Sequence, residues 1–353
     1  MKGVKIWWSL YLVMNPDYKF VLLDKSEYDK WDLFVDKSLQ GTIYHKSWWM
    51  AISGDNFRIF GCYNNSGDLI AGFTCYEYRL YGLLKCLGQG GNCVYQGNLY
   101  TGSEGKYLTQ LSRNRYICYE IAKTIKSYCH VASIVMSPYE MEDIMAFIWE
   151  GFTTAVNYTY VLDIKDLDII WKNMDVDCRN SIRKAVKDGI IVDTECDFNE
   201  VLELAGKTFL RQNRGPSSWI KDSPKYNRVI SDMSRCKSFV TRNKDGVPIS
   251  VVYIVWDSKR CYYEIGGYNH ESSHHGASSL ALWTAIEYAR KEIGLSEFDF
   301  EGTMLKNVEP FFREFGARLI PYYTVSWVDP RLKPLITLKQ LLRETSGMIK
   351  VPK

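Results

Sequence analysis

Residues 261–316, CYYEIGGYNHESSHHGASSLALWTAIEYARKEIGLSEFDFEGTMLKNVEPFFREFG, set the expected architecture of the chain. They predict a strand over Cys261–Tyr268, a polar loop rich in Ser and His, a helix over Ala277–Ala289 and a short strand over Glu297–Phe300. The first backbone N–H groups of a helix lack partners within the helix and suit an anion such as a pyrophosphate. This order of elements therefore indicates a site at the start of the helix.

The same order of elements appears twice along the chain. Residues 57–78, FRIFGCY-NNSGD-LIAGFTCYEY, match residues 237–256, KSFV-TRNKDG-VPISVVYIVW, as strand, turn and strand. Each copy continues with a further strand, a loop with Gly, a long helix and a buried strand. An internal duplication of this kind predicts two α/β units, each a mixed sheet flanked by helices.

Two segments carry a resemblance to a known family. They are residues 276–317, from Gly276 through DFEGTMLKNVEPFFREFGA, and RNSIRKAVKDGIIV at residues 179–192, and both resemble the FemAB-like and related acetyltransferases of the GNAT fold. The resemblance implies two tandem GNAT-like domains, each with a mostly antiparallel sheet. We expect the N-terminal domain at residues 17–165, the C-terminal domain at 166–330 and a helical tail at 331–353.

Composition narrows the class of protein. The chain has 353 residues, 46% hydrophobic and 24% charged, and a net charge of +3 gives no case for general binding to DNA or RNA. Ten separate cysteines indicate reduced thiols, and five histidines without ligand spacing predict no metal site. The apolar run within residues 1–14 is too short to span a bilayer, so we expect a cytoplasmic protein.

The loop before the predicted helix is the expected cofactor site. The resemblance implies acyl-CoA as co-substrate, held by His274, His275, Gly276, Ala277 and Ser278. The family signature Gln/Arg-x-x-Gly-x-Gly/Ala is not reproduced, because the two histidines stand where glycine is expected. A purely structural role, in which the loop caps the helix, therefore remains an alternative.

Carboxylates within apolar strands are the expected catalytic groups. Buried acids must be paired or must line a cavity, so we expect Glu301 to act as the general base. The further catalytic candidates are Glu264, Asp299 and Tyr268. For Asp299 the alternative is a salt bridge to a basic residue such as Arg313.

Two other segments are expected to bind substrate. Arg183 and Lys187 share one face of a basic helix and could hold a phosphate or a tRNA backbone, although a solvated helix face is the alternative. Residues 42–53, TIYHKSWWMAIS, resemble part of the family's acceptor groove, which implies substrate roles for His45 and Trp48. The alternative for the tryptophans is one core residue and one residue between the domains.

The resemblance implies an N-acyltransferase that transfers an acyl group, most simply acetyl, from acyl-CoA without a covalent enzyme intermediate, whereas the residues alone indicate an α/β duplication with a helix start suited to an anion. The resemblance implies an amine acceptor on a sugar, a nucleotide-sugar or a small peptide in envelope or polysaccharide synthesis. Two alternatives stay open: an aminoacyl-tRNA-dependent transferase of the Fem type, and a non-catalytic binding protein on the same fold.

Overall fold

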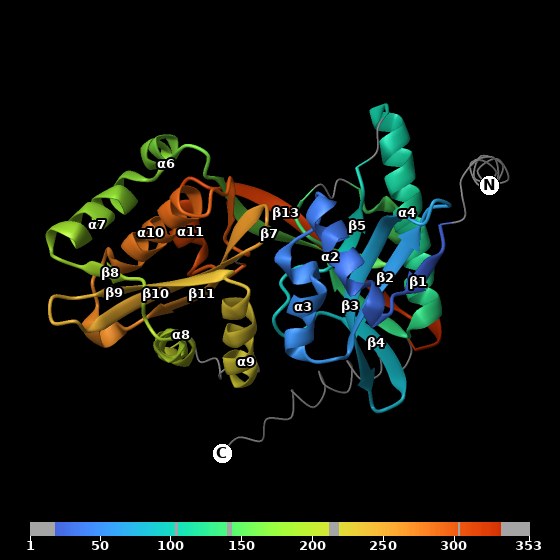
Figure 1. Cartoon of the computed structure of the whole chain (residues 1–353), viewed down its shortest axis with the longest axis horizontal. Helices are drawn as coiled ribbons and strands as arrows, with labels where there is room; N and C mark the ends of the chain where they lie inside the picture. Colours follow the sequence, from blue (N-terminus) through green and yellow to red (C-terminus); the bar gives the residue numbers. More distant parts are fainter. Residues whose placement is uncertain (1–17, 103–104, 140–142, 212–218, 303, 333–353) are drawn as a thin grey trace, which may run out of the picture.

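A computed structural model describes residues 18–102, 105–139, 143–211, 219–302 and 304–332 (Figure 1). The first half of the chain comprises β1 (Phe20–Leu22), α2 (Tyr28–Lys37), α3 (Ser47–Met50), β2 (Phe57–Tyr63), β3 (Leu69–Leu80), β4 (Leu84–Gly88), β5 (Gly97–Tyr100), α4 (Tyr107–Tyr128), β6 (Val131–Val135), α5 (Met145–Trp149) and β7 (Thr153–Asp163).

The second half repeats this order after two connecting helices. It comprises α6 (Leu167–Asn173), α7 (Val176–Lys187), β8 (Ile191–Asp193), α8 (Phe198–Arg211), α9 (Trp219–Asp232), β9 (Cys236–Arg242), β10 (Pro248–Trp256), β11 (Arg260–Tyr268), α10 (Ala277–Lys291), β12 (Glu297–Asp299), α11 (Glu309–Arg313) and β13 (Arg318–Val328). Except for β5, α6 and α7, each element has a counterpart in the other half. The predicted duplication of an α/β unit is confirmed.

All the strands belong to one sheet, in the order β1-β2-β3-β4-β6-β13-β7-β12-β11-β10-β9-β8, with β5 paired to β3. The two halves exchange their last strands. β13 pairs with β6 of the first half, β7 pairs with β12 of the second half, and β7 and β13 pair with each other from Arg318↔Val161 to Ser326↔Thr153. In Figure 1 these two strands lie between the two lobes.

The exchange bears on the expected domain ranges. The range 166–330 contains β13, which completes the sheet of the range 17–165, so the two ranges are interlocked rather than adjoined. Of the expected tail at 331–353, all but the first two residues lie outside the described part of the chain. Those two end a short 3-10 turn, Pro330–Leu332.

Three apolar cores hold the layers together. One core joins the halves, since it combines Tyr44 and Trp49 of the first with Tyr226 and Tyr262 of the second. A second core packs α7, α10 and α11 on the opposite face of the β9–β12 sheet, and a third packs α4 on the first half. Burial of this apolar area is the main stabilising term of the fold.

The described residues also bear on the cysteines, on membrane-spanning helices and on metal-binding clusters. The ten cysteines are free thiols, and eight of them are buried. Within the described ranges no helix is long and apolar enough to cross a bilayer, and no group of three His, Cys, Asp or Glu residues could hold a metal ion.

Candidate functional site

The site begins where two parallel strands part. β11 and β12 are paired from Arg260↔Glu297 to Tyr262↔Asp299, and their pairing ends there. Glu264 lies two residues beyond the last paired residue of β11. Glu301 lies two residues beyond the last paired residue of β12. The two sequence-predicted acids therefore occupy equivalent positions at the opening of one split in the sheet.

A β-bulge determines how Glu264 is placed. In the pairing of β10 with β11, Tyr253 faces Ile265 and Ile254 faces Tyr263, so Glu264 is the extra residue of the bulge. A bulge bends its strand and re-aims a side chain. The Glu264 carboxylate turns toward the core that joins the two halves, where it meets Tyr44.

Glu301 is held in an uncommon backbone conformation. Its φ is +59°, in the left-handed region that a residue with a side chain adopts at an energetic cost. Two hydrogen bonds hold this turn: the Glu301 N–H donates to Asp299 Oδ1 at 2.8 Å, and the Gly302 N–H donates to Thr159 Oγ1 at 2.7 Å. A strained backbone persists only where the surrounding structure holds it in place, and residues of this kind cluster at functional sites.

Tyr44 joins the two glutamates. Its hydroxyl lies 2.9 Å from Glu264 Oε2 and is hydrogen-bonded to Glu301 Oε1. A phenol carries one proton and can donate to one carboxylate only, so the other carboxyl group must itself carry a proton to complete the second hydrogen bond. Burial raises the pKa of Glu264 to about 8 and raises the pKa of Glu301 well above its usual value. The pair therefore retains a proton at neutral pH.

Asp299 is a fully buried carboxylate with four hydrogen bonds. It accepts from Tyr95 at 3.2 Å, Thr159 at 2.7 Å and Tyr139 at 2.6 Å, in addition to the Glu301 N–H. Arg313, offered above as its alternative partner, instead lies 3.6 Å from Glu309. The contacts of Asp299 hold the Glu301 turn in position.

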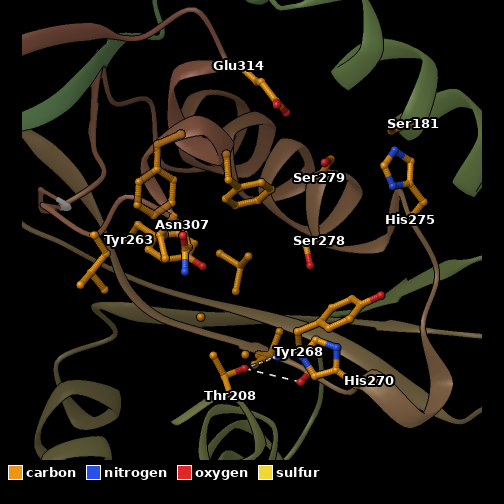
Figure 2. A pocket seen from close by; sticks show the side chains of 18 of the residues that line it. Ser181, Thr208, Tyr263, Tyr268, His270, His275, Ser278, Ser279, Asn307 and Glu314 are labelled. Carbon is orange, nitrogen blue, oxygen red and sulfur yellow. Dashed lines mark hydrogen bonds between the residues drawn. The ribbon is translucent and has the colours of Figure 1, made fainter. Parts of the chain in front are cut away.

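A cavity of about 920 Å³ lies along the same split (Figure 2). We call it the α10 cavity. On one side it is lined by Tyr263, Gly266 and Gly267 of β11, and on the other by Leu305 and Asn307, which follow β12. Its other walls come from the first turn of α10, one face of α7, and residues of α8, β10 and α11. A volume of this size is typical of a small-molecule or cofactor site.

Some of the predicted cofactor residues line the α10 cavity and others support the helix. His275 and Ser278 line it, and so does Tyr268, which was expected as a catalytic candidate. The Tyr268 N–H donates to Thr208 Oγ1 at 2.8 Å (Figure 2). His274 instead caps the helix: its Nδ1 accepts the Gly276 N–H at 3.2 Å, and its carbonyl accepts the Ala277 N–H at 3.1 Å.

Gly276 is required by packing. A Cβ atom at this position would lie 2.0 Å from the carbonyl oxygen of Ser181, so the missing side chain lets α7 approach the start of α10. His274 strengthens the same junction, since its Nε2 lies 3.1 Å from Asp188 Oδ2 at the end of α7. Of the first-turn amides, those of Gly276 and Ala277 thus already have partners.

The helix α7 presents a different face to the cavity from the one expected. Arg183 and Lys187 are exposed and do not line it, and the Arg183 guanidinium lies 5.4 Å from the Trp171 ring. The cavity wall is formed by residues at the next helical phase: Asp177, Asn180, Ser181 and Lys184. The Lys184 ammonium is paired with Asp188 at 2.5 Å.

The cavity also contains acidic groups. Asp177 and Glu314 both line it, and burial raises the pKa of Glu314, with the nearby negative charges of Asp175 and Asp177 adding to the effect. Lys184 is the single Lys or Arg among the described lining residues. The wall is therefore less positive than a site built only for phosphates.

His45 and Trp48 stabilise the segment that carries Tyr44. His45 is buried, its Nδ1 lies 2.8 Å from Thr42 Oγ1, and burial lowers its pKa to about 3. Trp48 is half-buried against Trp49, with ring centroids 6.0 Å apart. Neither residue lines the α10 cavity. The residue of segment 42–53 that reaches Glu264 and Glu301 is Tyr44, which the sequence did not single out.

Among its described residues, the first half has no equivalent opening. Its parallel pair, β4 and β6, is joined at Cys86↔Val131 and Leu87↔Ala132. Beyond that point Gln96 bridges to Met136, and the Gln96 N–H donates to the Val135 carbonyl at 2.7 Å. The split that forms the α10 cavity in the second half is thus occupied by the chain itself in the first.

Comparison with known proteins agrees with this asymmetry. Residues 173–313 match a family model described as an acetyltransferase (GNAT) domain. This match covers most of the second half of the chain, which contains the open split. It supports an acyltransferase and agrees with the resemblance to the FemAB-like and GNAT-related proteins. A non-catalytic binding protein, the third alternative above, is not favoured.

Solved structures resemble the whole chain. The crystal structure of FemX has 15% identity and a TM-score of 0.66, and the match covers 90% of this chain and 99% of that one. The C-terminal domain of a putative lysylphosphatidylglycerol synthetase from Agrobacterium fabrum has 10% identity and a TM-score of 0.54, covering 85% and 91%. A tandem GNAT protein from the clavulanic acid biosynthesis pathway has 9% identity and a TM-score of 0.52, covering 89% and 99%. No curated protein matches the sequence. At these identities the likeness shows the tandem GNAT fold.

Proposed function

We propose that this protein is a cytoplasmic N-acyltransferase that transfers an acyl group from acyl-CoA to an amine. As acceptor we propose a sugar, a nucleotide-sugar or a small peptide used in envelope or polysaccharide synthesis. The observation that carries the proposal is the split between β11 and β12. It has a ligand-sized cavity along it and two proton-sharing glutamates at its opening.

The proposed chemistry is direct transfer. The donor lies in the α10 cavity with its thioester directed through the split, and the acceptor amine approaches from the side of Tyr44. An ionised carboxylate of the Glu264–Tyr44–Glu301 cluster accepts the amine proton. The nitrogen attacks the thioester carbonyl carbon, the C–S bond breaks, and the thiolate leaves and takes up a proton. Asp299 acts by holding the Glu301 turn.

The experiment is an acyl-transfer assay. Purified protein is incubated with acetyl-CoA and sets of amino sugars, nucleotide-sugars and short peptides, and free thiol and acetylated product are measured together. Thiol release that requires one acceptor class supports the proposal. Absence of acetyl-CoA binding by calorimetry, together with absence of product, contradicts it.

One observation favours a second candidate, an aminoacyl-tRNA-dependent transferase. Asp177 and Glu314 face the α10 cavity, and two first-turn amides of α10 are occupied by His274. A donor with a cationic α-amino group would suit this wall better than a pyrophosphate does. Turnover with charged tRNA but not with acetyl-CoA would select this candidate.

A further inference from the structure

The duplication gives each half an equivalent hairpin, and the tips of the two hairpins differ: one is polar and the other is apolar. In the second half, β10 and β11 are joined by Asp257, Ser258 and Lys259, and this polar turn docks on the first half. Ser258 Oγ donates to Asp36 Oδ1 at 2.9 Å, and Lys259 Nζ donates to the carbonyls of Val35 at 3.2 Å and Ser38 at 2.6 Å. Its role in joining the two halves explains its polar sequence.

The equivalent hairpin of the first half is apolar at its tip and projects from the molecule. β3 and β4 are joined by Tyr81, Gly82 and Leu83, and the hairpin extends past the lower edge of its lobe in Figure 1. Tyr81 is 71% exposed and Leu83 is 78% exposed, the two largest values among the large hydrophobic residues of the described chain. Tyr78 and Leu80 beside them are also exposed.

The charges at the tip of this hairpin have a single sign. Residues 78–85, YRLYGLLK, include Arg79 and Lys85 and no acidic residue. Arg79 is exposed, and the Lys85 ammonium lies 4.0 Å from the centroid of the Tyr128 ring. An apolar tip flanked by basic side chains matches an anionic bilayer, because Leu and Tyr enter the interface while Arg and Lys contact headgroup phosphates.

A second protein copy is a poorer occupant of this tip. A stable protein interface buries roughly 800 Å² on each partner, whereas the side chains of a three-residue turn offer at most a few hundred. The tip residues Leu80 and Leu84 also pair with each other across the hairpin. Partial insertion into lipid needs no matching surface, and one such tip gives weak, reversible attachment.

We propose that the tip of the β3–β4 hairpin, residues 78–85, docks the protein on the surface of an anionic lipid bilayer. This inference is independent of the proposed reaction, because the hairpin lies outside the α10 cavity and the Glu264–Tyr44–Glu301 cluster. It assigns an interaction surface of defined lipid chemistry to the half of the molecule that has no open split.

The test is cosedimentation with vesicles of phosphatidylglycerol and phosphatidylcholine, compared with vesicles of phosphatidylcholine alone. The full chain is expected to bind the anionic vesicles and to dissociate as salt is added. The double variant Tyr81→Ser/Leu83→Ser should lower the partition coefficient roughly tenfold or more, since it removes the inserted apolar groups. Acyl transfer to a soluble acceptor should not change.

The matched control is Tyr107→Ser/Leu108→Ser at the start of α4, where the two residues are 66% and 68% exposed. This variant should bind vesicles as the unmodified protein does. The proposal is overturned if the unmodified protein ignores anionic vesicles, or if the tip variant binds them unchanged. It is equally overturned if the tip variant changes the sedimentation coefficient of the protein without lipid, because the tip would then join protein copies.

Discussion

Glu301 combines a strained backbone with a shared proton, and its role in proton transfer predicts the result of a substitution. Glu301→Gln keeps the shape of the side chain and the hydrogen-bond acceptor for Tyr44, but it cannot accept the amine proton. We expect turnover to fall by roughly 10²–10⁴ while the melting temperature and donor binding stay unchanged. Steady-state kinetics and thermal melts check this. Full activity, or simple unfolding, would assign Glu301 a structural role and make Glu264 the next candidate.

The raised pKa of Glu264 predicts a pH dependence with a definite sign. The folded protein keeps its proton up to about pH 8, whereas the unfolded chain releases it near its ordinary value. Folding stability from this group is therefore fully present at low pH and is lost as pH rises through the folded pKa. Activity should rise over the same range, because the carboxylate form is the base.

Glu264→Gln separates these effects. Removal of one of the two coupled groups should flatten the decline of melting temperature between about pH 5 and pH 8. Glu301 no longer shares Tyr44 with a second acid, so it should ionise at lower pH. The acidic limb of the pH–rate profile should therefore shift to lower pH. Unchanged melting and rate profiles would show that the two glutamates are not coupled.

The sequence located the acids of the site better than their partners. Glu264, Asp299 and Glu301 could be identified because carboxylates are costly within apolar strands. Tyr44 could not, because it reaches Glu264 across 220 residues of sequence and lies in an apolar segment where an aromatic residue is ordinary. Lys184 was missed in favour of Arg183 and Lys187 because the sequence of α7 does not reveal which face meets the cavity.

At the scale of elements, the start of α10 is capped by the side chain and carbonyl of His274. His274→Ala should lower the free energy of unfolding by about 1 kcal/mol, as loss of a helix cap does, and should leave donor binding intact. Denaturant unfolding and calorimetry measure the two quantities. Loss of donor binding without loss of stability would instead give His274 a direct role with the ligand.

Ser278 offers a sharper probe of the α10 cavity than Gly276. Any side chain at Gly276 would strike α7, so a loss of binding there could reflect misfolding. Ser278→Trp fills the cavity from its wall and should abolish acyl-CoA binding by calorimetry. Ser273→Trp, on an exposed residue of the loop before α10 and outside the cavity lining, is the control and should bind normally. Equal binding by both variants would place the donor elsewhere.

Strongly patterned elements were predicted closely. The helix expected at residues 277–289 is observed at Ala277–Lys291, and the long helix expected in the first copy is observed at Tyr107–Tyr128. The glycine-rich segment 88–97 gave no sign of β5, which begins at Gly97 and depends on pairing with β3 rather than on its own sequence. Pairing between distant segments is the part of the fold that local propensity leaves open.

At the scale of the whole molecule, the duplication was visible in the sequence and the strand exchange was not. β7 and β13 occupy the same place in the two repeats. The alternation of side chains along each strand is compatible with pairing in either sheet. The choice between them is made by tertiary packing: β6 pairs with β13, and β12 pairs with β7.

The exchange predicts that the halves depend on each other. Residues 1–165 or 166–353 expressed alone should aggregate, because each would expose an unpaired sheet edge and half of the shared core. Coexpressed, the two fragments should copurify as one particle and show acyl transfer. Gel filtration and thermal melts decide this. A fragment that is monomeric alone and melts cooperatively would contradict the interlocked arrangement.

The strand exchange also determines when each sheet can be completed during synthesis of the chain. A ribosome delivers β6 and β7 long before residues 318–328, so the nascent first half waits with its sheet unfinished while the whole second half is translated. Its last neighbour, β13, is synthesised only after the other strands of the second half. Premature termination just before residue 318 would therefore leave β6 and β7 each with one unpaired edge, although all the other strands of both repeats had been made.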